Sequence, residues 1–163
     1  MKQLVISIAI LCVLSFMACT NQTQSNDQKA NLAEVAKTIS PMNNAVSIVE
    51  IPVIDLARAI QFYQNMLNVS IESVDMGDTQ MGVIPNDPGT VNVVLVKGAD
   101  YVPTTSGAVI YLNAGEDLQP MLDKVEKSGG EIILPKTEIS PEMGFFALFV
   151  DTEGNKLGLH SSN

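Results

Sequence analysis

The chain has 163 residues, a net charge of −9 at pH 7 and a sequence pI near 4.4. Such an acidic chain does not neutralise a run of phosphates, which argues against a nucleic-acid partner. The same charge argues against electrostatic attachment to an anionic membrane surface.

The first segment of the chain has the pattern of an export signal. Lys2 precedes an apolar run over 4–14, and a short stretch ending in Ala18 leads to Cys19. The run is too short for a permanent membrane-spanning helix, which needs roughly 20 apolar residues. The small residue before a cysteine resembles a bacterial lipoprotein signal, although Phe16 stands where leucine is usual.

This resemblance implies that residues 1–18 are removed and that Cys19 is lipidated. The protein is then expected to be lipid-anchored in the bacterial cell envelope, facing the periplasm or the surface, with the lipid as its only membrane contact. An ordinary secreted protein and an uncleaved anchor are the alternatives. Residues 19–44 are polar and predict a flexible tether, which leaves one domain over 45–163.

The cysteine and histidine content limits the chemistry of that domain. Cys12 leaves with the signal and Cys19 carries the lipid, so no thiol remains for a disulfide, a thiolate metal site or a nucleophile. His160 is the only histidine. A zinc site with the usual nitrogen and sulfur ligands therefore cannot be built within one chain.

The domain begins with a strand pattern over 46–53, followed by a helical pattern that Asp55 can cap and that ends at Leu67. Strand patterns follow over 69–74, 80–84 and 91–96. The apolar positions of the helix recur at i, i+3, i+4 and i+7: Leu56, Ala59, Ile60, Tyr63, Met66 and Leu67.

The same order of elements then returns. A strand over 109–114 precedes a helix that Asp117 opens, with Pro120 in its first turn and glycines at 129–130 to end it. Three strand patterns follow: 131–134, 145–150 and 156–160. Each half reads strand–helix–strand–strand–strand and cannot bury both sheet faces alone. We therefore expect an α+β fold in which two βαβββ modules pair into one curved mixed sheet.

Four segments in this order resemble the glyoxalase / bleomycin-resistance / extradiol-dioxygenase superfamily, also called vicinal oxygen chelate proteins. They are 49–63, 109–113, 129–137 and 144–161. Within this superfamily, the chain resembles lyase-like members of unassigned substrate. The resemblance implies paired βαβββ modules around a concave cavity, and a homodimer.

The resemblance also implies a divalent metal held by His and Glu side chains from four strands, and here the sequence departs from the family. Three of the implied ligand positions fall on Ile48, near Val109 and on Gly158, none of which can bind a metal through its side chain. The fourth has no placement over 90–96, where Asn92 is the only amide. We therefore expect no metal and no other cofactor.

Strand alternation places Glu50, Tyr111, Asn113 and His160 toward the cavity. In one interpretation Glu50 and His160 form an acid–base pair that orients a bound small molecule or exchanges a proton with it. Tyr111 and Asn113 then add hydrogen bonds. In the other, His160 is a solvated strand end and Glu50 lies at an open rim.

Four further side chains have two interpretations. Met81 and Met143 are expected in the core, with a ligand pocket as the alternative. Phe145 and Phe146 are likewise expected in the core rather than in a stacking platform.

Two functions follow from these observations. The first is binding or sequestration of a small molecule, as in bleomycin-resistance proteins. The second is a lyase- or isomerase-like enzyme that uses Glu50 and His160. An envelope location argues against a glyoxalase, because it separates the protein from a glutathione-type thiol pool.

Overall fold

The computed structural model describes residues 44–163. The signal over 1–18, the lipidation site Cys19 and the tether up to residue 43 lie outside the described residues. The first module comprises β1 (Ile48–Pro52), α2 (Leu56–Leu67), β2 (Glu72–Asp75), β3 (Gln80–Ile84) and β4 (Asn92–Lys97). The second comprises β5 (Tyr111–Asn113), α3 (Gln119–Lys127), β6 (Glu131–Ser140), β7 (Gly144–Val150) and β8 (Lys156–Ser161).

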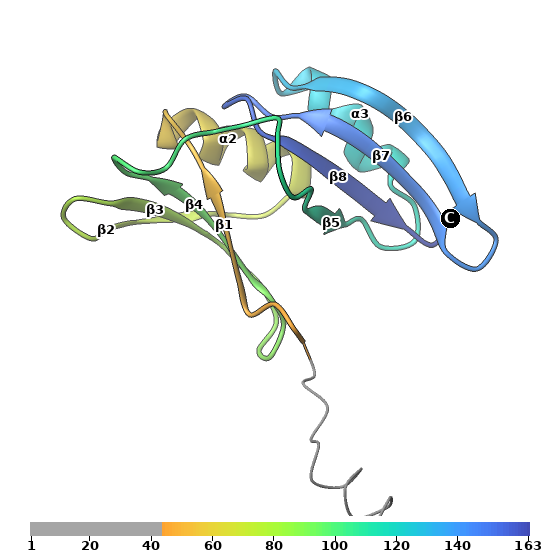
Figure 1. The fold of residues 1–163 in the computed structure, drawn as a ribbon, viewed down its shortest axis with the longest axis horizontal. Coiled ribbons are helices and arrows are strands. Elements are labelled where there is room, and N and C mark those ends of the chain that lie inside the picture. Colours follow the sequence, from red (N-terminus) through yellow and green to blue (C-terminus); the bar gives the residue numbers. More distant parts are fainter. Residues whose placement is uncertain (1–43) are drawn as a thin grey trace, which may run out of the picture. The chain divides into compact units, whose positions relative to one another are not determined.

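The paired βαβββ modules are confirmed, and each module builds its own sheet. The two four-stranded sheets have the orders β1-β4-β3-β2 and β5-β8-β7-β6 (Figure 1). In each sheet the two strands that come first and last along the chain, β1 with β4 and β5 with β8, pair in parallel. The other pairs are antiparallel. Hydrogen-bond ladders therefore run within the modules, and the eight strands form two sheets rather than one continuous sheet.

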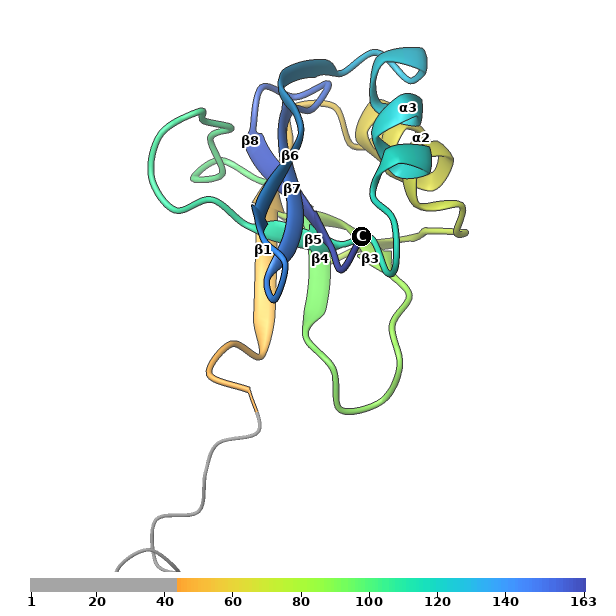
Figure 2. The ribbon, with the colours of Figure 1, turned by 90° about the vertical axis from the view of Figure 1, so that its right-hand side faces the viewer.

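Helices α2 and α3 pack their apolar sides against the strands. Asp55 caps α2 by accepting a hydrogen bond from the Arg58 N–H at 3.1 Å, and Asn68 ends the helix in the left-handed region. Figure 2 shows α2 and α3 side by side, on one side of strands β6–β8. Neither helix of residues 44–163 is long and apolar enough to cross a membrane.

The strand β6 extends well past its predicted end. The strand was expected over 131–134, but β6 continues through Pro135 to Ser140, with three register shifts against β7. β6 is an edge strand, where a proline that lacks an N–H removes no necessary ladder bond. The long edge strand matters for the site, because its far end carries Ile139.

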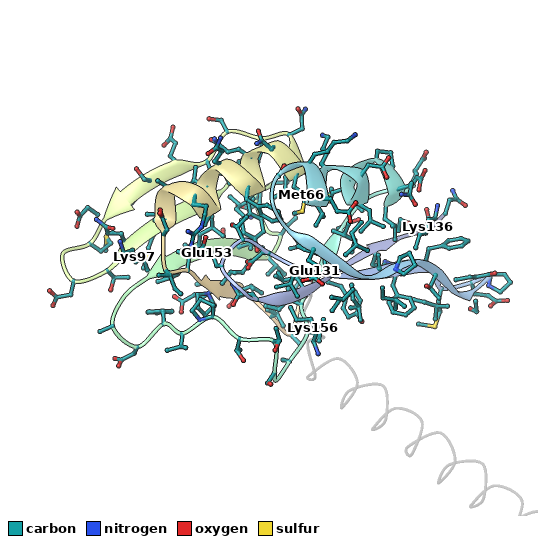
Figure 3. All side chains as sticks on the ribbon, turned by 90° about the horizontal axis from the view of Figure 1, so that it is seen from above. Met66, Lys97, Glu131, Lys136, Glu153 and Lys156 are labelled. Atoms are coloured by element: carbon teal, nitrogen blue, oxygen red, sulfur yellow. The ribbon has the colours of Figure 1, made fainter. Side chains whose placement is uncertain are left out.

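The turn between β7 and β8 joins the second module to the first. The Glu153 carboxylate accepts hydrogen bonds from the N–H groups of Ile54 at 3.0 Å and Asp55 at 2.9 Å, and it pairs with the Arg58 guanidinium at 2.8 Å. Figure 3 shows Glu153 beside α2. Burial alone raises the pKa of Glu153, but the hydrogen bonds from Arg58 and the backbone outweigh it, so this pKa lies below its usual value.

A second buried contact lies next to the first. The Tyr63 hydroxyl donates to Asp151 Oδ2 at 2.7 Å, and Asn155 Nδ2 donates to the same carboxylate at 2.9 Å and to the Pro52 carbonyl at 2.8 Å. Burial, together with the negative charge of Asp151, raises the pKa of Tyr63 well above its usual value. These bonds hold α2 and β1 to the second module without a strand ladder between them.

Candidate functional site

One face of the second sheet packs on the helices and the other is open. Leu112, Ala147 and Leu159 are buried on the helix side. On the open side the ladder places Tyr111 opposite Gly158, and it places His160 between Asn113 and Phe146. The structure thus brings together three of the four candidate residues, Tyr111, Asn113 and His160, on neighbouring strands.

The ring of Tyr111 lies across Gly158. A Cβ at position 158 would overlap this ring, so the ring can occupy its place only because residue 158 is glycine. The Phe146 ring lies beside it, with the centroids 6.3 Å apart and the planes at 58°. This spacing is within the range of favourable aromatic pairs, about 4.5–7 Å. The two rings form an aromatic wall on the open face.

His160 lies next to this wall with its orientation fixed by the backbone. Its Nε2 atom is 2.7 Å from the carbonyl oxygen of Met143 in the β6–β7 turn. A carbonyl oxygen can only accept a hydrogen bond, so Nε2 is the protonated donor of this contact. The Met143 N–H in turn donates to the Ser140 carbonyl at 3.1 Å, which holds the turn.

These groups line a pocket of about 480 Å³: Tyr111, Ile139, Met143, Phe146 and His160. Its volume is within the usual range for small-molecule sites, about 300–1,000 Å³. The lining contains aromatic and aliphatic side chains and one imidazole, and it includes no carboxylate, ammonium or guanidinium group. The aromatic rings and the aliphatic side chains offer apolar contact, and the histidine offers a hydrogen bond.

Asn113 takes a local structural role beside this pocket. Its Oδ1 atom accepts a hydrogen bond from the Gly115 N–H at 2.9 Å, in the turn that follows β5. Gly115 has a φ of +72°, a conformation that glycine adopts without strain. Asn113 is on the open face but does not line the pocket.

Glu50 lies on the first sheet, with a different partner. Its carboxylate accepts a hydrogen bond from the Tyr101 hydroxyl at 2.9 Å. This bond, followed by burial and the negative charge of Glu50, raises the pKa of Tyr101. The predicted alternation along β1 is present, because Ile51 is buried and Glu50 is exposed.

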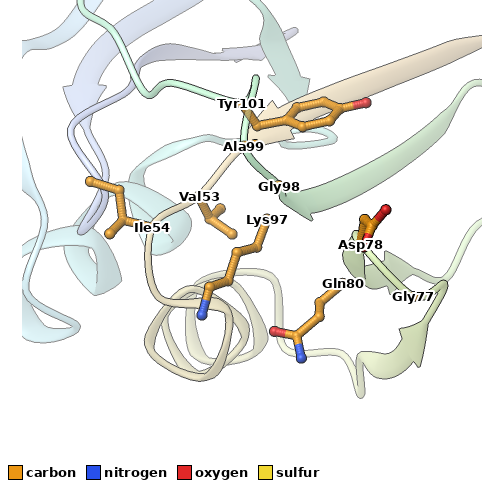
Figure 4. A pocket seen from close by; sticks show the side chains of 9 residues that line it. All are labelled: Val53, Ile54, Gly77, Asp78, Gln80, Lys97, Gly98, Ala99 and Tyr101. Atoms are coloured by element: carbon orange, nitrogen blue, oxygen red, sulfur yellow. The ribbon is translucent and has the colours of Figure 1, made fainter.

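Tyr101 also borders a second pocket, of about 470 Å³, at the end of the first sheet (Figure 4). Val53 and Ile54 give it an apolar side, and Asp78 and Lys97 give it charges of both signs. In Figure 4 the Tyr101 hydroxyl points away from Lys97, and its acceptor Glu50 is not among the residues that line this pocket.

The expected pair of Glu50 and His160 is not formed. Glu50 bonds to Tyr101 and His160 bonds to Met143, and within residues 44–163 no ion pair involves either side chain. The two side chains do not meet because β1 and β8 belong to different sheets, although the alternation along each strand was inferred correctly. The acid–base role of these two residues stays a hypothesis without a contact between them.

Three residues that line the pocket were not assigned to it from the sequence: Phe146, Met143 and Ile139. Phe145 packs against the core as expected, but Phe146 lines the pocket. Strict alternation along β7 could have separated them, since adjacent strand residues face opposite sides. Met143 takes the alternative position in a pocket rather than the core, because the residue is 60% exposed and lines the pocket. Ile139 was missed, because β6 was expected to end before it.

The residues present do not fit the metal site that the resemblance implies. The implied ligand position at Gly158 lies under the Tyr111 ring, so a longer side chain there would displace the ring. Ile48, at another implied position, is an exposed apolar side chain. In residues 44–163 no three His, Cys, Asp or Glu side chains are grouped closely enough to hold an ion.

Comparison with known proteins agrees with this fold. The profile of the Glyoxalase/Bleomycin resistance protein/Dioxygenase superfamily matches residues 45–159. A glyoxylase-like domain-containing protein from Didymella fabae is 30% identical over 123 residues, which are 70% of this chain and 91% of that protein.

Solved structures share the fold at lower identity. TnmS3, an antibiotic binding protein from a Streptomyces species, is 20% identical with a TM-score of 0.59, covering 76% of this chain and 99% of its own. A glyoxalase I mutant from Zea mays is 20% identical with a TM-score of 0.58, covering 71% of this chain. The match spans only 46% of the maize protein's length.

Proposed function

Because the chain belongs to the glyoxalase/bleomycin resistance protein/dioxygenase superfamily, we propose that it binds a small molecule on the open face of its second sheet. The observation that carries this proposal is the pocket of about 480 Å³ between Tyr111, Phe146 and His160. TnmS3, which shares this fold and is described as an antibiotic binding protein, supports binding as the function. The enzymatic alternative has less support, because Glu50 and His160 have separate partners.

The proposed binding uses no metal. Support comes from the Tyr111 ring, which lies over the implied ligand position at Gly158, and from a pocket lining without carboxylates. Affinity then comes from apolar contact with the aromatic wall and from one hydrogen bond. Full burial of a Phe-sized side chain is worth about 1.5–3 kcal/mol, and because both rings are already partly covered, each contributes less than this.

The proposed location is the bacterial cell envelope, with the domain held there by lipid on Cys19. The support is the sequence pattern of the first segment, in which Ala18 precedes Cys19 after an apolar run. Replacement of Cys19 with Ala should release the protein from the membrane fraction, and metabolic labelling with a fatty-acid analogue should label only the unsubstituted chain. Equal membrane retention and labelling of both forms would contradict the anchor.

We also propose that two copies of the chain pair, as the family resemblance implies. Exposed apolar side chains on the strands outside the pocket, such as Ile48, Val74 and Ile133, supply the surface that a partner would cover. Light scattering after size exclusion should give twice the mass of one chain. A single-chain mass at high protein concentration would contradict the pairing.

The binding proposal is tested by screening neutral aromatic compounds for a rise in the melting temperature of the purified protein. A ligand that binds only the folded state stabilises it by RT ln(1 + [L]/Kd). Compounds that stabilise the parent protein should lose most of that effect in the Tyr111→Ala and Phe146→Ala variants.

The matched control is Val83→Ala, which shortens an exposed apolar side chain on the first sheet. It should leave the ligand-induced shift unchanged. The proposal fails if no compound stabilises the parent protein, or if the Val83 variant loses the shift as fully as the Tyr111 variant.

A further inference from the structure

We infer that the pocket selects an uncharged molecule that combines a ring-containing apolar body with one hydrogen-bond donor, which the Nδ1 atom of His160 accepts. This inference rests on the proposed binding function and specifies the ligand class for the same site. It follows from the direction of one hydrogen bond, from the charge of the lining and from the rigidity of one turn.

The hydrogen bond to Met143 sets the tautomer of the neutral ring. A neutral imidazole has one N–H donor and one bare nitrogen acceptor. Because Nε2 donates to the Met143 carbonyl, the acceptor is Nδ1. Nδ1 has no hydrogen-bond partner among residues 44–163, and His160 lines the pocket. The pocket therefore offers an acceptor to a ligand.

The charge of the lining disfavours ionic ligands. None of the five lining residues carries a carboxylate, an ammonium or a guanidinium group. With the His160 ring neutral, an ion that leaves water for this surface gains no paired charge, and burial of an unpaired charge is costly. The chain's net charge of −9 adds a general repulsion for anions.

The turn that carries the Met143 carbonyl is tightly fixed. The Met143 N–H donates to Ser140, and the next residue, Gly144, has a φ of +73°. A Cβ on Gly144 would overlap the backbone of Ser161 and Ser162. The turn thus packs against the end of β8, which holds the carbonyl opposite the His160 ring.

The tautomer can be measured directly, because the chain has a single histidine. Nitrogen-15 NMR of the ring, in mildly alkaline buffer, separates a protonated from a bare ring nitrogen. We expect a protonated Nε2 and a bare Nδ1 in the folded protein without ligand. A folded protein in which Nδ1 carries the proton would overturn the inference and leave the binding function untouched.

The ligand class can be measured with four naphthalene probes that differ in one group. They are 2-naphthol, 2-methoxynaphthalene, 2-naphthoate and 2-naphthylmethylammonium. Binding of each probe is followed by the changes in amide chemical shifts of the purified protein. We expect 2-naphthol to bind about fivefold tighter than its methyl ether, which corresponds to one hydrogen bond of about 1 kcal/mol. We expect both ions to bind more weakly than 2-naphthol.

The His160→Phe variant keeps a ring but removes both nitrogens, so it should abolish the preference for 2-naphthol over its ether. The control Lys97→Gln alters the pocket on the first sheet and should keep the preference. Equal affinities in the parent protein, or tighter binding of either ion, would overturn the ligand class. No shift at Tyr111, Phe146 or His160 with any probe would instead contradict both the ligand class and the proposed binding function.

Discussion

At the scale of single residues, Glu153 is a buried charged side chain that joins the two modules. Its carboxylate is fully buried and is satisfied by Arg58 and by two backbone N–H groups of the first module. The ion pair of Lys136 with Asp117 has a similar N–O distance, 2.7 Å, but it lies within the second module and is partly exposed. Exposed pairs contribute little, about 0–1 kcal/mol.

Replacement of Glu153 with Gln should lower the free energy of unfolding by about 2 kcal/mol, because hydrogen bonds to a charged group are worth about 1.5–3 kcal/mol. The amide keeps the shape but removes the charge that faces Arg58. Urea unfolding measures the change. The matched control, Lys136→Gln, should cost less than about 1 kcal/mol. An equal loss of unfolding free energy in the two variants would show that the Glu153 contact contributes no more than an exposed ion pair.

Acid should weaken the protein through the same residue. The pKa of Glu153 is lowered in the fold from its ordinary value of 4.5, so below that value the unfolded chain binds the proton more readily. The stability that Glu153 contributes is complete above the unfolded pKa and is lost as pH falls through the folded pKa. The unfolding free energy of Glu153→Gln should therefore fall less than that of the parent protein upon acidification. Parallel pH curves would contradict this assignment.

At the scale of elements, β5 and β8 make the aromatic wall together. β5 has only three residues, and its pairing places Tyr111 opposite Gly158. The ring takes the space above the glycine that a side chain on β8 would need. The pocket shape is therefore a property of the strand pair rather than of Tyr111 alone.

Replacement of Gly158 with Ala should displace the Tyr111 ring and destabilise the protein by about 1–3 kcal/mol, as overpacking does. In a Tyr111→Ala background the same substitution should cost little, because the overlap is gone. A double-mutant cycle by urea unfolding should give a coupling energy within about 0.5–3 kcal/mol. Additive effects would mean that the ring moves aside freely and does not depend on Gly158.

Elements were predictable from the sequence where local signals agree. The cap at Asp55 and the apolar spacing of α2 were sufficient for its start and its end at Leu67. The course of β6 was not predictable, because Pro135 breaks a central strand but is tolerated at an edge. Whether a strand is at an edge is decided by tertiary pairing, which the local sequence does not contain.

At the scale of the whole molecule, the internal repeat was enough to predict two βαβββ modules, because each half has the same order of elements. It did not predict how the modules join. They join through a shared apolar core and through hydrogen bonds of Glu153, Asp151 and Asn155, rather than through a strand ladder. Buried polar contacts between distant segments leave no periodic signal in a sequence.

The candidate site was predictable within one sheet, but not across the two sheets. Alternation within one sheet correctly placed Tyr111 and His160 on one face, since their strands are paired in that sheet. Alternation also placed Glu50 on the exposed side of β1, but it could not relate Glu50 to His160, because relating β1 to β8 requires the arrangement of two sheets. Phe146 and Ile139 could be assigned to the pocket only from the register of β7 and the observed length of β6.

Binding of a small molecule against the aromatic wall of the second sheet can be seen in a crystal structure of the protein with a compound that stabilises it. We expect the compound to lie against Tyr111 and Phe146, with a donor within hydrogen-bond distance of His160 Nδ1. A compound bound instead between Lys97 and Tyr101 in the first-sheet pocket, with the aromatic wall empty, would contradict it.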